Sequence, residues 1–470
     1  MNPSPQISDS FLNYSLTSQD RLAWEELLSD APDCISVGEI LSQWQMAKRH
    51  FAISNRELPL PVWRQRRFDH DGNRAWHELS SGFVSETSAD PISIYIHIPF
   101  CDRRCGFCDC YSMPLGKAST DIEGSYVNAL LGEMETWRSV RQIDNRPVTT
   151  VHFGGGTPSC IGEAHFGSIV RQCRACYTTT DRTEFALELT TSLLDDKHLD
   201  ALHGWGFSRL HIGVQTLEDE ARLLIGRKED SATVLKKLER AIQLGFTVST
   251  DILLGLPGQT ISGFLGTLSR LVEVGVHGFS LYQLQMSRRN RKFIERVGGK
   301  DRGTLFEYLL FQLAEQYLTS HNFRKNHFDH FSLPEDRNLY CTHASRKEDL
   351  LALGTTADGA FGYYHYRHPA IKQYISKTEV GLPALEGGMS ESSFEKRVRP
   401  GVVSLMVARI SDATFHDFDA VALRDAWLEC LLLKADPQSD EFSLTANGSW
   451  FINEMIEQFK NGVLRDTFIH

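Results

Sequence analysis

The sequence predicts an α/β fold, a partial (β/α)6, TIM-like barrel with a helical N-terminal extension and a small C-terminal domain. Between residues 92 and 286, short runs rich in β-branched residues alternate with amphipathic stretches long enough to cross back over a sheet. Polar residues interrupt several of these runs near their ends. This alternation is typical of parallel βα units, whose reactive groups gather on one rim of the barrel.

Six runs are candidate strands of the barrel, at residues 92–98, 149–153, 185–189, 210–214, 248–253 and 279–284. Helices are expected between them, and the clearest candidates are residues 122–138, 232–244 and 260–274. Six strands are fewer than a complete barrel needs, so we expect the barrel to be partial.

The rest of the chain is expected to surround this barrel. Apolar residues recur at helical spacing from Leu22 to Met46, after the start signals Ser18 and Asp20. The segment Leu58-Pro59-Leu60-Pro61 then ends any helix. We expect four parts: a helical extension at 1–90, the barrel at 91–300, a barrel-closing segment at 301–388 and a C-terminal domain at 389–470.

The composition is that of a globular protein, with 470 residues, 41% hydrophobic and 23% charged. No stretch approaches the roughly 20 uninterrupted apolar residues of a membrane span. The N-terminus lacks the basic start and apolar core of a signal peptide, and we expect a cytoplasmic monomer. The net charge of −11 argues against a nucleic-acid-binding surface.

Four of the ten cysteines lie within ten residues, directly after the first candidate strand. Cys101, Cys105 and Cys108 are separated by three and then two residues, so one loop can wrap three thiolates around one cluster. Zinc sites and ferredoxin clusters use four protein ligands, whereas three cysteines leave one iron for a substrate or cofactor. The alternative is ordinary buried thiols or a disulfide. Cys173 and Cys176 have no partner pair and are not expected to bind metal.

A glycine run follows the second candidate strand, in the segment Gly154-Gly155-Gly156-Thr157-Pro158. Residues without a Cβ let backbone amides approach a phosphate, a carboxylate or an amino-acid group closely. Turns also use glycine freely. The position directly after a strand nevertheless favours contact with a ligand.

Three polar residues interrupt strands that should be nearly all apolar: Glu188, Gln215 and Asp251. A buried polar group costs several kcal/mol unless it is paired. Each of these side chains could pair with a neighbouring backbone group. Together, at strand ends around one rim, they are typical of ligand contacts.

Basic clusters occur despite the acidic net charge, at residues 64–67, 288–292 and 396–399. They are either solvated surface or a means of binding substrate carboxylates, for which guanidinium groups have a suitable geometry.

These motifs together resemble the radical S-adenosylmethionine superfamily. The resemblance rests on Tyr95-Ile96-His97-Ile98-Pro99-Phe100-Cys101, on the spacing of the three cysteines and on the glycine run. Cys110, Gly213-Val214-Gln215 and Gly255-Leu256-Pro257-Gly258-Gln259-Thr260 are similar to the oxygen-independent coproporphyrinogen oxidase-like branch. The resemblance covers residues 92 to 290 and continues more weakly to a HemN-type domain at the C-terminus.

The resemblance implies that Cys101, Cys105 and Cys108 hold a 4Fe-4S cluster and that Cys110 is not a ligand. The remaining iron would bind S-adenosylmethionine, from which one electron generates a deoxyadenosyl radical. An external donor such as flavodoxin or ferredoxin would supply that electron. No catalytic side chain for the substrate is assigned, and the implied cofactor contacts are Tyr95, Gly155, Gly156, Thr157, Glu188, Gln215, Arg227 and Asp251.

The reaction is expected to differ among members of this branch. Residues 279–284 and Tyr111 resemble the methyltransferases of the branch, which use two S-adenosylmethionine molecules. We therefore expect a methyl or methylene unit to be transferred to an sp² carbon of a small aromatic or tetrapyrrole-like substrate. Cys110 and Asp329-His330-Phe331 favour the alternative of oxidative decarboxylation of coproporphyrinogen. The short closing segment favours a haem chaperone.

Histidine is frequent in the second half of the chain. A satisfied surface or core imidazole is the usual role of such a residue. Flanked by Tyr363, Tyr364 and Tyr366, the group could instead line a pocket for a flat substrate. Its members are His321, His327, His330, His343, His365 and His368.

Overall fold

The computed structural model describes residues 18–32, 35–51, 67–82, 90–103, 105–115, 120–140, 143, 145–297 and 303–467. The expected helix stop at residues 58–61, Cys34 and most of the basic cluster at 64–67 lie outside the described residues.

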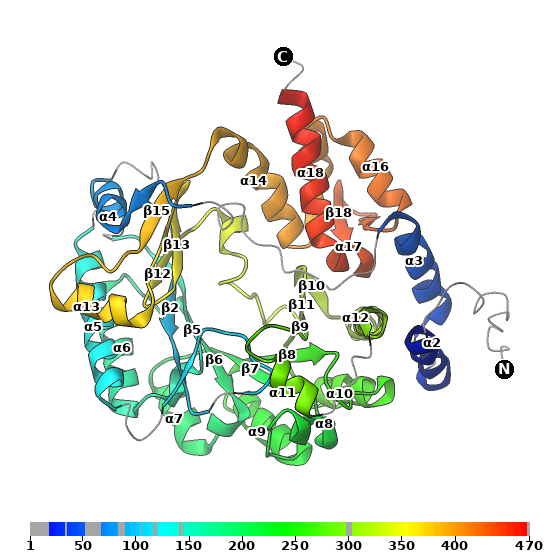
Figure 1. Cartoon of the computed structure of the whole chain (residues 1–470), viewed down its shortest axis with the longest axis horizontal. Helices are drawn as coiled ribbons and strands as arrows, with labels where there is room; N and C mark the ends of the chain where they lie inside the picture. Colours follow the sequence, from blue (N-terminus) through cyan, green and yellow to red (C-terminus); the bar gives the residue numbers. More distant parts are fainter. Residues whose placement is uncertain are drawn as a thin grey trace.

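Seven parallel strands form the curved centre of a 13-stranded sheet (Figure 1). Six of them agree with the predicted strands to within two residues at each end, which confirms the α/β barrel. The seventh, β12, lies in the predicted closing segment and was not predicted as a strand. In spatial order the seven are β12 (Asp349–Leu353), β2 (Ile92–Ile98), β5 (Val148–Gly155), β6 (Glu184–Thr190), β7 (Arg209–Gln215), β8 (Thr247–Leu254) and β9 (Gly278–Gln283).

Helices cover the outer face of these strands, as Figure 1 shows. Several begin at a side-chain cap, such as Asp195, Asp230 and Thr260, whose oxygen accepts a backbone N–H of the first turn. The helices between the barrel strands are α5 (Thr120–Arg138), α6 (Glu163–Cys176), α7 (Asp196–Gly204), α8 (Asp219–Leu224), α9 (Ser231–Gln243) and α10 (Ile261–Glu273).

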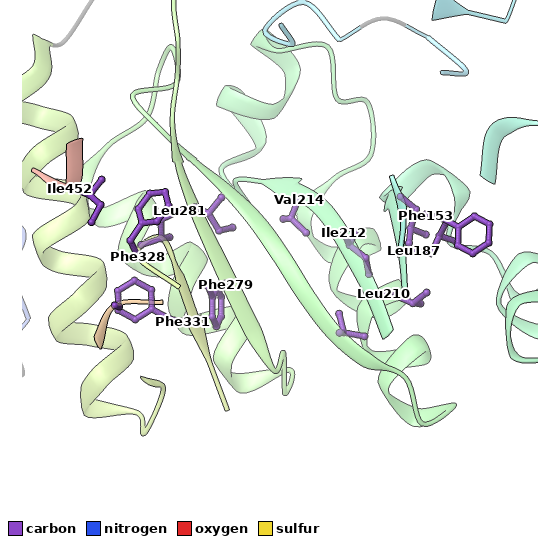
Figure 2. Packing of buried hydrophobic residues seen from close by; sticks show 14 of the residues in the cluster. Phe153, Leu187, Leu210, Ile212, Val214, Phe279, Leu281, Phe328, Phe331 and Ile452 are labelled. Carbon is purple, nitrogen blue, oxygen red and sulfur yellow. The ribbon is translucent and has the colours of Figure 1, made fainter. Parts of the chain in front are cut away.

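A continuous apolar core lies between the sheet and these helices. Figure 2 shows that it extends from Phe153 on β5, past Ile212 and Leu281, to Phe331 and Ile452. The parallel strands read as nearly unbroken apolar runs because both of their faces are covered.

The sheet continues beyond both edges of the parallel strands with antiparallel strands that we did not predict. They are only two to four residues long and carry few β-branched residues, so no alternating pattern identifies them. Beyond β12 the order is β13 (Asp358–Phe361), β14 (Tyr364–Arg367), β15 (Gly387–Ser390) and β1 (His70–Asp71), and beyond β9 it is β11 (His330–Ser332) and β10 (Arg324–His327).

The N-terminal helices and the C-terminal part of the chain both pack on α12 (Gly303–Ser320). The buried Asn447 connects them, because its Oδ1 accepts hydrogen bonds from Tyr308 Oη (2.6 Å) and Gln312 Nε2 (2.9 Å). Its Nδ2 donates to the carbonyl oxygen of Gln43 at 3.0 Å. Figure 1 shows the N-terminal helices α2 (Ser18–Asp30) and α3 (Val37–His50) beside α12.

The remaining elements surround this framework. Among the described residues, no helix is long and apolar enough to cross a membrane. The domain boundaries near residues 90, 300 and 388 remain proposals.

The remaining elements are β3 (Phe100–Cys101), β4 (Met113–Pro114), α4 (Gly72–Ser80), α11 (Arg291–Arg296), α13 (Ile371–Glu379), α14 (Ser393–Met406), β16 (Arg409–Ser411), α15 (Asp412–Asp417), α16 (Val421–Glu429), β17 (Leu433–Ala435), β18 (Glu441–Leu444), α17 (Ala446–Trp450) and α18 (Ile452–Thr467).

A buried carboxylate attaches the closing segment to the barrel. Glu133 on α5 accepts hydrogen bonds from Tyr374 Oη (2.5 Å), the Gly354 N–H (2.9 Å) and Trp137 Nε1 (3.2 Å). It also pairs with His368 Nε2 at 2.5 Å. Burial alone would raise the pKa of Glu133, but these donors and His368 hold the pKa below its usual range.

We expect Glu133→Ala to lower the free energy of unfolding by about 3–5 kcal/mol, because it leaves a buried imidazole and three donors without their acceptor. Urea-induced unfolding followed by circular dichroism measures this loss. The matched control is Glu135→Ala on the exposed face of α5, expected to change stability by less than about 1 kcal/mol. Equal effects of the two substitutions would contradict the anchoring role of Glu133.

Candidate active site

A cavity of about 900 Å³ opens where the parallel strands end. Its wall is formed by the loop after β2, the glycine run after β5, the ends of β6, β7, β8 and β9, and the segment after β7. In a parallel barrel the carboxyl ends of the strands share one rim, so side chains from distant parts of the sequence meet there.

The cysteine loop, residues 101–112, begins on β3 and forms one side of the cavity. It is held at both ends, because Met113 N donates to Pro99 O (2.7 Å) and Leu115 N to Cys101 O (2.8 Å). Cys101 is buried, and its Sγ lies 3.8 Å from Thr157 Oγ1 on the neighbouring loop. The two loops after β2 and β5 are therefore in direct contact.

Glycine at position 156 is required by this contact. A Cβ on Gly156 would lie 2.4 Å from the carbonyl oxygen of Phe100 and 3.0 Å from the Sγ of Cys101. Real Cβ atoms do not approach a carbonyl oxygen so closely. Any side chain here would therefore push the start of the cysteine loop out of place.

The three predicted cluster ligands all line the cavity. Burial raises the pKa of Cys101 and of Cys105, and the charge of Arg227 partly opposes the rise at Cys105. Three thiols on one loop are the donor type that iron–sulfur clusters use, so the residues fit such a group in kind. Within the described residues, no three His, Cys, Asp or Glu side chains are close enough to hold a metal ion, so binding requires the loop to draw the sulfurs together.

Cys110 lines the same cavity, although it is not one of the three predicted cluster ligands. Its backbone N–H donates to Cys108 Sγ at 3.4 Å. The turn between the two residues is thereby closed on the sulfur of Cys108.

Glu188 projects from the end of β6 towards the glycine run. Its carboxylate binds His152 Nε2 at 2.9 Å and accepts the N–H of Gly155 at 3.1 Å. Burial would raise the pKa of Glu188, but the hydrogen bond and charge of His152 lower it to about 2. Glu188 is therefore an anion at neutral pH, and its side chain remains 35% exposed towards the cavity.

Tyr95 does not line the cavity. Its ring stacks on Tyr340 with centroids 5.0 Å apart, and its hydroxyl bonds to His97 Nδ1 at 3.0 Å. The ring lies against Gly154, where a Cβ would be 2.9 Å from it. Tyr95 therefore supports the glycine run from behind.

Gln215 ends β7 in the left-handed region, with φ of 73°. The pairing of β7 with β8 shifts register between Gly213 and Gln215, so the strand is irregular where it reaches the cavity. Such a conformation costs about 1–2 kcal/mol for a residue with a Cβ. The strained residue, Gln215, is thus one whose side chain lines the cavity.

His211 is a cavity residue that sequence reasoning missed. Its Nε2 bonds to the carboxylate of Asp251, and its Nδ1 lies 2.7 Å from Ser249 Oγ. Burial lowers the pKa of His211, but the charge of Asp251 and its hydrogen bond together outweigh burial, and the net pKa is raised. The sequence held a usable signal, because His211, like Gln215, is a polar residue in an otherwise apolar strand.

Two guanidinium groups stand together in the segment after β7. Arg222 is 1% exposed, and it donates from Nη1 to the carbonyl oxygens of Val214 (3.1 Å) and Thr216 (2.8 Å). Burial and the charge of Arg227 lower the pKa of Arg222 to about 10. Arg227 was predicted, whereas the cavity residue Arg222 was missed because it lies on a short helix that the sequence does not signal.

None of the six histidines of the second half lines this cavity. His330, His365 and His368 are buried, and each bonds to a carboxylate. His327 likewise bonds to Asp329 at 2.5 Å. His321 and His343 bond to backbone carbonyl oxygens. Their role as satisfied imidazoles, the first of our two interpretations, agrees with these contacts.

The chain is similar to known proteins over much of its length. Residues 95–271 match the family model described as the radical SAM superfamily. Among curated proteins, oxygen-independent coproporphyrinogen III oxidase of Escherichia coli (strain K12) is 27% identical over 315 residues, 64% of this chain and 68% of that protein. Heme chaperone HemW of Bacillus subtilis (strain 168) is 32% identical over 194 residues, 41% of this chain and 50% of that protein.

A solved structure shares the fold of nearly the whole chain. Coproporphyrinogen III oxidase (HemN) from Escherichia coli, described as a radical SAM enzyme, superposes with a TM-score of 0.71. The match has 22% sequence identity and covers 87% of this chain and 99% of that chain. The partial barrel and the segments on both sides of it are therefore a shared architecture.

We expect Gln215→Gly to unfold with a free energy about 1 kcal/mol higher than that of Gln215→Ala, because glycine adopts positive φ without a Cβ clash. Both variants lose the amide, so the difference isolates the backbone strain, and urea-induced unfolding measures it. At Lys236 on α9 the same pair of substitutions should give the opposite order. Equal stability of the two position-215 variants would contradict the strain.

Proposed function

Because the chain belongs to the radical SAM superfamily, in its oxygen-independent coproporphyrinogen III oxidase-like branch, we propose that it is a radical methyltransferase. One S-adenosylmethionine serves as the radical source, and a second supplies a methyl or methylene unit. The acceptor is an sp² carbon of a small aromatic or tetrapyrrole-like molecule. The chain is a radical SAM enzyme in either case, and the methyl donor is the finer part of the proposal.

Cys101, Cys105 and Cys108 are the proposed ligands of the 4Fe-4S cluster. When bound with S-adenosylmethionine, such a cluster supplies a deoxyadenosyl radical after one-electron reduction by an external donor such as flavodoxin or ferredoxin. Burial raises the pKa of Cys105, and the charge of Arg227 opposes part of that rise.

The neighbouring residues are suited to hold the cofactor. Gly155, Gly156 and Thr157 line the cavity beside Cys101, so an amino-acid group bound there would lie against small residues. Glu188 is ionised and already oriented by His152, so it can bind an ammonium group without reorganisation.

Other rim residues complete the proposed cofactor site. Asp251, held by His211, presents a carboxylate that can accept hydrogen bonds from hydroxyl groups. Gln215 and Arg227 supply an amide and a cation on the same wall. Tyr95 acts indirectly in this proposal, as the support of Gly154.

One observation carries the proposal: ten of the eleven predicted site residues line a single cavity. A volume of about 900 Å³ is near the upper end of the range for small-molecule sites, about 300–1,000 Å³. Such a cavity leaves room for a second molecule beside one bound cofactor.

Oxidative decarboxylation of coproporphyrinogen is the second candidate. It is supported by the similarity of the chain to the oxygen-independent coproporphyrinogen III oxidase of Escherichia coli. Asp329 and His330, whose motif favoured it in the sequence, do not line the cavity, and His330 is buried against Asp336 at 2.7 Å. A haem-carrying role, after the relative from Bacillus subtilis, is the third candidate.

Mass spectrometry of the products after anaerobic reconstitution distinguishes these functions. Methyl transfer should release S-adenosylhomocysteine together with deoxyadenosine. Deoxyadenosine and methionine alone, with loss of carbon dioxide from coproporphyrinogen, would replace the methyl-transfer proposal by decarboxylation. Stoichiometric haem binding without any cleavage of S-adenosylmethionine would favour the chaperone.

Cys105→Ala should abolish both the brown chromophore and turnover, because two cysteines cannot hold the cluster. Iron analysis and the visible absorption spectrum measure the first effect. Cys430→Ala, at the end of α16 and outside the cavity, is the control and should keep the iron content of the unmodified protein. Retained iron and activity in Cys105→Ala would contradict the proposed ligands.

A further inference from the structure

A dense group of positive charges follows β9. Residues 286–297 contain five basic side chains and a single acidic one, in a chain whose net charge is −11. All five are exposed, and we call them the basic patch: Arg288, Arg289, Arg291, Lys292 and Arg296.

The basic patch faces away from the cavity. Gln285 and Phe293, on either side of its first four members, line the cavity, whereas none of the patch residues does. The sequence had left open that this cluster binds substrate carboxylates inside the site. Its exposed position favours an external partner instead.

The patch is attached directly to the cysteine loop. Arg289 Nη1 donates to the carbonyl oxygens of Asp109 (3.1 Å) and Cys110 (3.3 Å). Ser287 Oγ donates to Asp109 Oδ1 at 2.8 Å, and the buried Asn290 donates from Nδ2 to Phe107 O at 2.8 Å. These residues are about 180 positions apart in the sequence.

Helix α11 packs on the same loop (Figure 1). A Cβ on Gly106 would lie 2.4 Å from the ring of Phe293, so the absence of a side chain at Gly106 brings the helix into contact with the backbone. Gly106 lies between Cys105 and Cys108 in the sequence. The patch is therefore the charged surface of a segment that contacts the cysteine loop at Gly106, Phe107, Asp109 and Cys110, beside two of the three proposed ligands.

We propose that the basic patch, with the exposed Met286, docks an acidic one-electron carrier protein of the flavodoxin or ferredoxin class. This inference rests on the proposed function. One electron leaves the carrier's reduced flavin or iron–sulfur centre, which is oxidised, and enters the cysteine-bound cluster, which is reduced. Transfer rates fall steeply with distance, so the carrier has to bind on the surface nearest to that loop.

The positive charge of the basic patch determines both which carrier binds and where it binds. A protein with a net charge of −11 repels an acidic carrier over most of its surface, so a local positive field fixes where such a carrier binds. Complexes of electron carriers are small and transient, and a few exposed charges around one apolar side chain suffice for them. Met286, 44% exposed, provides that apolar contact.

The test compares two triple charge reversals in the reconstituted holoenzyme. Arg291→Glu/Lys292→Glu/Arg296→Glu changes the patch but keeps Arg289, which holds the loop. The matched control is Arg171→Glu/Arg182→Glu/Lys236→Glu, three exposed positions on outer helices and in the turn before β6. Binding of purified flavodoxin is measured by calorimetry at several salt concentrations.

The patch variant should bind flavodoxin at least about tenfold more weakly and lose most of the salt dependence, because exposed charges are screened by salt. The control should stay within about twofold of the unmodified enzyme. Cleavage of S-adenosylmethionine driven by dithionite should be unchanged in both variants, because a small reductant needs no docking site.

Unchanged flavodoxin binding in the patch variant would overturn the docking site. Weakened binding of a carboxylate-bearing tetrapyrrole, with flavodoxin binding intact, would overturn it in favour of a substrate contact. Absence of dithionite-driven cleavage in the unmodified enzyme would instead overturn the proposed function, while the flavodoxin binding measurement still decides the inference.

Discussion

The close contact between the loops after β2 and β5 is the constraint on which the site depends. Gly156 N donates to Ile98 O (2.9 Å) and Thr157 N to Phe100 O (2.7 Å), so the two loops leave the sheet as one unit. Because no Cβ intervenes at Gly156, Cys101 lies beside the glycine run. The position of the first thiol is thus fixed by backbone hydrogen bonds between neighbouring strands. The rest of the cysteine loop, by contrast, is held by α11 and the segment before it.

Much of the barrel could be predicted from the sequence because its signals are local. Apolar runs such as Ile92–Ile98 and polar interruptions such as Glu188 and Asp251 are visible in a short window, and parallel pairing then brings their ends together. The cysteine spacing and the glycine run are local patterns too, so the proposed cluster ligands and several cofactor contacts could be identified from the sequence. Local sequence patterns at strand ends are enough to predict site residues when the parallel topology brings those strand ends together.

The remaining features depend on contacts that no short window contains. The edge strands are too short for a periodic pattern, and the attachment of Arg289 to the cysteine loop joins residues about 180 positions apart. His211 was overlooked because a single histidine in a strand is usually a satisfied core residue. Its importance follows from Asp251 and Ser249 on the adjacent strand. The resemblance implies that Tyr95 contacts the cofactor, and its stacking on Tyr340 is a further contact between residues far apart in the sequence.

The parallel pairing of β2 with β12 has a consequence for how the molecule assembles. Ile92 pairs with Asp349, so the first barrel strand made during synthesis stays exposed along one edge until most of the chain has followed. Contacts of such long sequence separation form slowly and late, and an open strand edge invites aggregation meanwhile. The same delay leaves the rim of the barrel open until β12 pairs with β2.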